Sequence, residues 1–153
     1  MTDTSTSLAQ RNKDLVREFQ ANCMHAQRFD LMPDYLAPDL VIHLPTGLVQ
    51  QGRENAFSWF RECTEWFTSR GIEVKMMLAD EDTVFQLIEL HFEHTGDYLG
   101  VPASGKLLSV PGLAAFKIRN GLIAEHWGLY EMDSIPRQLG LTPEQLAAPW
   151  RQD

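Results

Sequence analysis

The sequence predicts a single α+β domain in which helices come first and a long antiparallel sheet follows. Three observations lead to this prediction. The length of 153 residues is usual for one domain. Apolar residues recur at three- and four-residue steps in the N-terminal part, whereas the last half reads as long strands separated by turn signals. Helical patterns followed by a run of strands are typical of the α+β class.

Two long helices and one short helix are predicted. The first covers residues 8–28, and its apolar residues share one face: Leu8, Leu15, Val16, Phe19, Cys23 and Ala26. A short helix around Met32–Leu36 follows, then Pro38. The second long helix covers residues 54–69, with Gly71 as its stop signal. Its apolar stripe is wide and aromatic: Ala56, Phe57, Trp59, Phe60, Cys63, Trp66 and Phe67.

Five strands are predicted, at Leu40–Leu44, Ile72–Leu78, Thr83–Thr95, Leu107–Arg119 and Leu122–Tyr130. The last two are joined by Asn120-Gly121, a strong two-residue hairpin signal. Asp80–Asp82 reads as a turn, and Gly96–Gly105 as a Gly/Pro-rich connection. A helical turn at Asp133–Leu139 and a helix-start pattern at Thr142-Pro143-Glu144 complete the chain.

Composition excludes several functional classes. The formal net charge of −8, with scattered basic residues, argues against a nucleic-acid or anionic-membrane surface. No apolar stretch approaches the ~20 residues of a membrane helix. Residues 1–7 are polar and are interpreted as a flexible tail, and residues 8–153 as the domain. Cys23 and Cys63 are expected to be buried free thiols, which fits a cytoplasmic protein.

No metal or cofactor is predicted. The cysteines have no metal-ligand spacing, and His91 and His94, three apart on a strand, point to opposite faces. Nucleotide-binding glycine loops and serine-hydrolase motifs are also missing from the sequence. On the same strand Glu89, His91 and Glu93 are expected on the outer face or at a dimer contact, because the opposite face is mainly apolar.

The stretch from His94 to Gly140 resembles a known family. Its marks are His94-Thr95-Gly96, Gly100-Val101-Pro102 with Gly105, Asn120-Gly121 with Ile123, Glu125-His126-Trp127 and Gln138-Leu139-Gly140. In their order and spacing these resemble the SnoaL-like polyketide cyclases of the nuclear transport factor two-like superfamily, over about residues 8–141. The resemblance implies a cone-shaped α+β barrel, a pocket between the concave sheet and the N-terminal helices, and a homodimer through the sheets.

The resemblance also contains one departure. In the aldol cyclases of this group, an Asp two positions after the residue matching His126 acts as general acid/base, assisted by a His on the preceding strand. Here those positions are Gly128 and Ala114. A glycine cannot exchange a proton, so the aldol mechanism of those cyclases is not carried over.

Strand alternation predicts the pocket floor. If residue 128 faces the pocket, so do Ala124, His126 and Tyr130. On the preceding strand the inward set is Leu108, Val110, Gly112, Ala114, Phe116 and Ile118. Small residues at 112, 114 and 128 are expected to leave room for a small apolar molecule.

Three residues are candidates for catalysis. His126 is the first candidate, because the reference pKa of a histidine, about 6.5, suits proton transfer near neutral pH, and the alternative is a hydrogen-bonded structural histidine. His43 is a candidate partner, although an apolar-flanked histidine is often part of a core. Tyr130 offers a phenol that could polarise a carbonyl.

The candidate substrate-binding residues are Tyr35, Trp59, Phe60, His94, Phe116, Gly128 and Glu131. Core packing is the alternative for the aromatic side chains, and a surface charge is the alternative for Glu131. Two functions stay open. One is a cofactor-independent isomerase, cyclase or dehydratase acting on an apolar carbonyl compound, and the other is a non-catalytic ligand-binding or dimeric accessory module.

Overall fold

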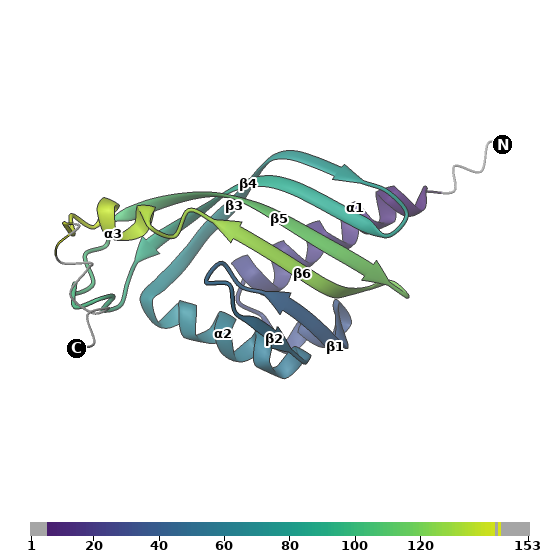
Figure 1. The fold of residues 1–153 in the computed structure, drawn as a ribbon, viewed down its shortest axis with the longest axis horizontal. Coiled ribbons are helices and arrows are strands. Elements are labelled where there is room, and N and C mark those ends of the chain that lie inside the picture. Colours follow the sequence, from purple (N-terminus) through teal and green to yellow (C-terminus); the bar gives the residue numbers. More distant parts are fainter. Residues whose placement is uncertain (1–5, 143, 145–153) are drawn as a thin grey trace.

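A computed structural model describes residues 6–142 and 144. The predicted α+β class is confirmed, with helices packed on a curved sheet of six strands in the order β2-β1-β6-β5-β4-β3 (Figure 1). The helices are α1 (Leu8–Phe19), α2 (Arg53–Trp66) and α3 (Ser134–Gln138). The strands are β1 (Leu36–His43), β2 (Val49–Gln51), β3 (Phe67–Ala79), β4 (Thr83–His94), β5 (Leu107–Arg119) and β6 (Leu122–Tyr130).

The sheet differs from the expected barrel in two respects. It is open, with β2 and β3 at its two edges, and so does not close on itself. It is also mixed, because β1 runs parallel to β6 whereas the other neighbours are antiparallel. In Figure 1, α1 passes behind the long strands and α2 lies below β1 and β2.

The first helical region is divided, and the prediction of one helix over residues 8–28 is wrong. Ser7 accepts a hydrogen bond from the backbone N–H of Gln10 and caps α1. The chain then widens into a π-helical segment, Gln20–His25, where the N–H of Ala26 bonds to the carbonyl of Ala21. A 3₁₀ helix at Phe29–Asp34 replaces the short helix expected at Met32–Leu36.

The second helix ends three residues before its predicted end. At Phe67 the backbone is already extended (φ −135°, ψ 137°), so α2 passes directly into β3. Gly71, the expected stop signal, instead lies inside β3 with φ +130°, beside a register shift between Ser69 and Gly71. A left-handed φ suits glycine and explains its presence within a strand.

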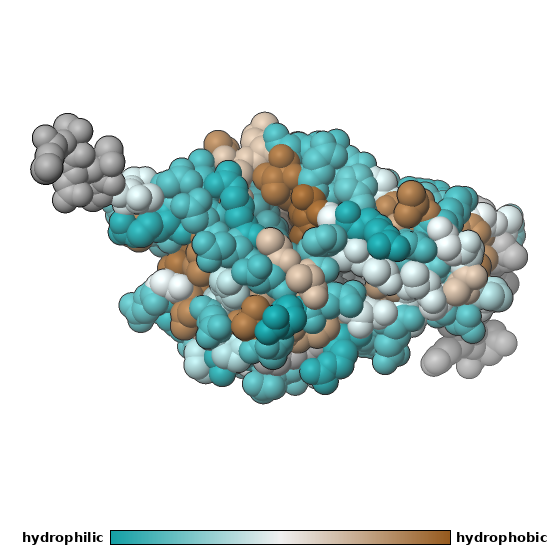
Figure 2. Space-filling model, turned by 180° about the vertical axis from the view of Figure 1, so that it is seen from behind, coloured by the Kyte–Doolittle hydropathy of each residue, from teal (hydrophilic) through white to brown (hydrophobic). Residues whose placement is uncertain are grey.

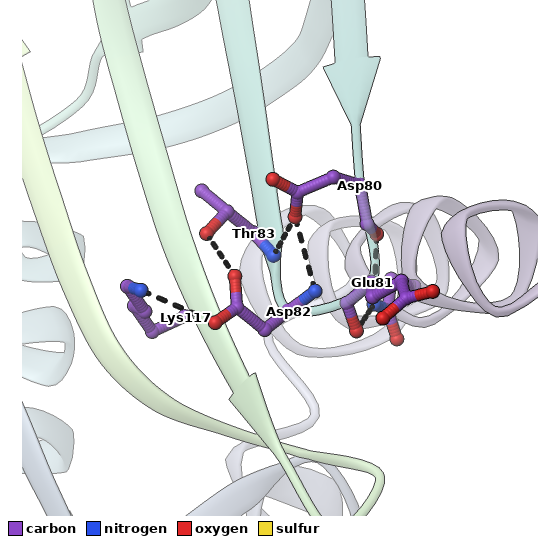
Figure 3. Close-up of polar contacts among 6 residues, drawn as sticks. Asp80, Glu81, Asp82, Thr83 and Lys117 are labelled. Carbon is purple, nitrogen blue, oxygen red and sulfur yellow. Dashed lines mark hydrogen bonds and ion pairs between the residues drawn. The ribbon is translucent and has the colours of Figure 1, made fainter.

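Polar contacts attach α1 to the turn between β3 and β4 (Figure 3). The Asp80 carboxylate accepts backbone N–H bonds from Asp82 (3.0 Å) and Thr83 (2.8 Å), which closes the predicted turn. Asn12 of α1 donates its side-chain amide to the backbone carbonyl of Glu81 (3.0 Å). These contacts hold the helix over the concave face of the sheet.

The β5–β6 hairpin forms as predicted, with left-handed φ at both Asn120 (52°) and Gly121 (73°). The inward alternation of β5 is confirmed, since its even-numbered side chains lie on the core side. One position of β6 is corrected. A register irregularity between Lys117 and Ile118 places Ile123, instead of Ala124, in the core.

No helix within the described part of the chain is long and apolar enough to span a membrane. On the side of the molecule seen in Figure 2, hydrophobic residues form several small groups among hydrophilic ones. The Thr142-Pro143-Glu144 pattern and the segment after it lie largely outside the described residues.

Candidate functional site

A cavity of about 130 Å³ lies between the concave face of the sheet and the two helical regions. Its floor is formed by β3, β4, β5 and β6, and its walls come from α2 and from the junction of α1 with the π-helical segment. An apolar cavity of ~150 Å³ can take up a molecule of benzene size. Side chains from each element include Phe19, Gln20, Trp59, Phe60, Ile88, Phe116, His126 and Tyr130.

His126 lies on the cavity floor and is only 8% exposed. Its ring is stacked on Phe116 with a centroid separation of 4.6 Å. The Nε2 atom is buried and has no hydrogen-bond partner among the residues that the structure describes. Burial, and to a smaller extent the proximity of His43, lowers the pKa of His126 from 6.5 to about 4. The imidazole is therefore neutral at pH 7.

Tyr130 also faces the cavity, and its ring leans back along β6 over Gly128. A Cβ atom at residue 128 would lie 3.0 Å from the phenol oxygen and 2.7 Å from ring carbon Cε2. A Cβ atom at Gly112 would lie 2.3 Å from Cδ1 of the same ring. Burial raises the pKa of the phenol, so it stays protonated and can donate a hydrogen bond.

The two glycines therefore do not leave room for a ligand as expected. The ring of Tyr130 fills the space above Gly112 and Gly128, and Ala114 is the small residue of β5 that pairs with Gly128 on one side and with Gln86 of β4 on the other. The proton-exchanging group nearest to position 128 is thus a phenol.

His43 is on the opposite face of the sheet, so the pairing of His43 with His126 is wrong. On β1, Ile42 points inward and is 3% exposed, which turns His43 outward. His43 Nε2 donates to Glu125 Oε1 at 2.8 Å, and its ring stacks on Trp127 at 4.7 Å. His43 does not line the cavity.

The other predicted site residues divide into two groups. Trp59, Phe60 and Phe116 line the cavity. Tyr35, His94 and Glu131 lie outside it, and each has another partner. The Tyr35 hydroxyl accepts from Asn22 Nδ2 (2.8 Å), His94 Nδ1 is hydrogen-bonded to Ser104 Oγ (2.9 Å), and the exposed Glu131 accepts from Arg137 Nη2 (3.0 Å). Gly128 has no side chain, and the ring of Tyr130 packs directly against it.

Sequence reasoning missed the amide pair beside the cavity. Gln20 Nε2 donates to Gln86 Oε1 at 2.7 Å, and Gln86 Nε2 donates to Gln20 Oε1 at 3.1 Å. Alternation along residues 83–95 puts Gln86 on the inward face together with the apolar side chains, whereas Gln20 is not among the predicted site residues. A signal was available, because residue 20 lies on the same helical stripe as Val16, Phe19 and Cys23.

The cavity contains one thiol, that of Cys63. Burial, with a smaller effect of Glu62, raises the pKa of Cys63 to about 11, so the thiol is protonated at neutral pH. Within the described ranges, no group of three or more His, Cys, Asp or Glu residues is arranged to hold a metal ion. The polar side chains that line the cavity are an imidazole, phenols, amides, the thiol of Cys63 and the hydroxyls of Thr64 and Ser69.

A family model described as SnoaL-like polyketide cyclase matches residues 14–139. A proposed polyketide cyclase from Xanthomonas campestris pv. campestris is 23% identical (TM-score 0.76), over 87% of this chain and 99% of its own. TsrD from Streptomyces laurentii is also 23% identical (TM-score 0.72), over 86% of this chain and 96% of its own.

AclR from Streptomyces galilaeus, a proposed hydroxylase, is 23% identical (TM-score 0.74), over 95% of this chain and 92% of its own. At these identities the likeness shows the fold alone. No curated protein sequence matches the chain.

Proposed function

The chain belongs to the SnoaL-like polyketide cyclase family, and from this premise we propose that it is a cofactor-independent acid/base enzyme acting on a small apolar carbonyl compound. The observation that carries the proposal is His126, a buried neutral imidazole without a hydrogen-bond partner among the described residues, at the floor of an apolar cavity. Buried polar groups in native proteins are nearly always paired, and an unpaired one requires an explanation. A bound substrate supplies the missing partner.

The proposed step is removal of a proton from the carbon next to the substrate carbonyl. The neutral imidazole of His126 takes the proton, and the C–H electron pair moves into the carbonyl to form an enolate. Tyr130 donates its phenol hydrogen to the carbonyl oxygen and stabilises the negative charge that develops there. The imidazolium then returns the proton to another carbon in an isomerisation, or to a departing oxygen in a dehydration.

Hydrogen–deuterium exchange tests this step without knowledge of the natural substrate. The probe is 2-indanone, a ring ketone whose α-carbon exchange in D₂O is followed by NMR. The wild-type chain should accelerate exchange above the buffer rate, and His126→Gln should cut the protein-catalysed part at least about tenfold. His43→Gln, on the outer face, is the matched control and should exchange at the wild-type rate. Equal rates in wild type and His126→Gln would remove His126 from the mechanism.

A second function, a non-catalytic binding module, is favoured by one observation. Positions 114 and 128 carry no proton-exchanging group, and an imidazole with a pKa of about 4 is a weak base. A pH series between 5 and 8 does not separate the two functions, because His126 stays neutral throughout that range. Binding of 2-indanone without any acceleration of exchange would favour the module.

The proposed assembly is a homodimer through the outer face of the sheet. Four strands place apolar side chains side by side there, in the register Met76–Leu87–Leu113–Leu129. Leu113 and Leu129 are 38% and 64% exposed. A contiguous exposed apolar patch of this kind is typical of protein–protein contacts, and a second copy of the chain would cover it.

A further inference from the structure

We infer that Gln20 is a specificity-determining residue of the cavity, which recognises a second oxygen function, hydroxyl or carbonyl, on the ligand. This inference rests on the proposed binding of a carbonyl compound in the same cavity. It extends that proposal from one anchored oxygen, at Tyr130, to two oxygens held at opposite ends of the cavity floor.

The reciprocal amide pair leaves hydrogen-bonding capacity unused. A side-chain amide has two N–H donors and two acceptor lone pairs. In the Gln20–Gln86 pair, each residue uses one N–H donor and one lone pair. Gln86 is completely buried, whereas Gln20 is 8% exposed and lines the cavity. The remaining donor and lone pair of Gln20 are therefore the groups that a ligand can reach.

The backbone and the partner amide both fix the position of Gln20. Gln20 is the first residue of the π-helical segment, and such interruptions of α-helices occur frequently at functional sites. The two hydrogen bonds to Gln86 hold its side chain in one arrangement before any ligand arrives. A pre-ordered group loses little conformational entropy on binding, which favours a role in recognition.

Sheet register relates the amide pair to Tyr130. Gln86 is paired with Ala114, and Ala114 is paired with Gly128, over which the phenol lies. Neighbouring strands are about 4.8 Å apart, so the backbones of Gln86 and Gly128, two strands apart, are separated by roughly 10 Å. A six-membered ring with oxygens on opposite sides, together with one hydrogen bond at each end, spans a similar distance. The cavity volume of about 130 Å³ is also of single-ring size.

A matched pair of ligands tests the recognition. We choose 4-hydroxyacetophenone and 4-methylacetophenone, which have similar size and the same ketone, and differ in whether the para group forms hydrogen bonds. Their dissociation constants are measured by NMR titration of the indole N–H signal of Trp59, which lines the cavity. The wild-type chain should bind the hydroxy compound about tenfold more tightly, as expected for one buried hydrogen bond.

Substitution of the amide should abolish this preference. In Gln20→Met, which keeps the side-chain length, the two dissociation constants should agree within about twofold. The double variant Gln20→Met/Gln86→Met removes both amides together and leaves neither unpaired, so it provides a folded variant if the single substitution fails to fold. Gln10→Met, on the exposed face of α1, is the control and should keep the wild-type preference.

The outcomes separate the inference from the proposed function. Equal binding of the two compounds by the wild-type chain, or a preference that survives in the double variant, would overturn the role of Gln20 and leave the carbonyl-binding cavity intact. If neither compound shifts the Trp59 signal at millimolar concentration, the proposed cavity function is overturned, and the role of Gln20 with it.

Discussion

The phenol of Tyr130 occupies the space that a side chain at residue 128 would need, with its oxygen 3.0 Å from the position of a Cβ atom there. The aldol cyclases that this chain resembles carry a carboxylate at that position. In this chain the glycine allows a hydroxyl group to enter the same volume from two residues further along β6. The absence of a side chain at residue 128 and the position of the Tyr130 hydroxyl are thus linked.

Gly128→Ala tests this packing. The added Cβ would meet ring atoms of Tyr130 at 2.7 to 3.0 Å, so the ring has to move and the fold should lose about 1–3 kcal/mol of stability in urea unfolding. Binding of a carbonyl probe should weaken as well. In a Tyr130→Leu background the same substitution should cost much less, because the ring is gone. Equal costs in the two backgrounds would contradict the contact.

His126 should make the fold sensitive to acid. Its pKa of about 4 in the folded chain lies below its usual value of 6.5, so the unfolded chain takes up the proton first as the pH falls. The contribution to stability is complete above pH 6.5 and is lost between pH 6.5 and 4, by roughly 3 kcal/mol in total.

Urea unfolding at pH 7 and pH 4.5 measures this effect. His126→Gln cannot take up the proton and should lose about 2–3 kcal/mol less than the wild type between these two pH values. Parallel losses in the two proteins would show that His126 is not buried as a neutral group.

The fold could be predicted from sequence because its signals are local. Residues close together in sequence determine the alternation of inward and outward side chains in β4 and β5, and they also determine the Asn120-Gly121 turn. The structure confirms both predictions. The division of the first helical region and the parallel pairing of β1 with β6 depend on tertiary packing. No pattern of three- or four-residue steps distinguishes a π-helical turn from the α-helix before it.

The candidate site could be predicted only in part, for a related reason. Strand alternation correctly placed His126 and Tyr130 on the cavity side, but it gave no information on where a side chain leans along its strand. The ring of Tyr130 leans along β6 in this way and occupies the space above Gly128. The Gln20–Gln86 pair joins residues 66 apart in sequence, and only the fold brings them together.

His43→Gln should leave ligand binding unchanged. The His43 side chain is on the outer face, 31% exposed, and is hydrogen-bonded to Glu125 and stacked on Trp127. Because a partly exposed pair of this kind contributes at most about 1 kcal/mol, the variant should also stay folded. The measurement is the dissociation constant of 4-methylacetophenone, compared with that of His126→Gln. A loss of affinity in His43→Gln of more than about threefold would contradict its position outside the cavity.

Leu129→Lys should separate the proposed homodimer into monomers. The leucine is 64% exposed on the outer face and is paired in register with Leu113, so a second copy of the chain would bury both. Insertion of an ammonium group into that contact leaves a charge without a partner, which costs several kcal/mol and favours dissociation. Light scattering coupled to size-exclusion chromatography measures the mass, which for one chain is 17.5 kDa. Leu48→Lys is the matched control, because Leu48 is equally exposed at 64% but lies in the β1–β2 connection. A dimer that persists in Leu129→Lys would exclude this part of the sheet as the contact.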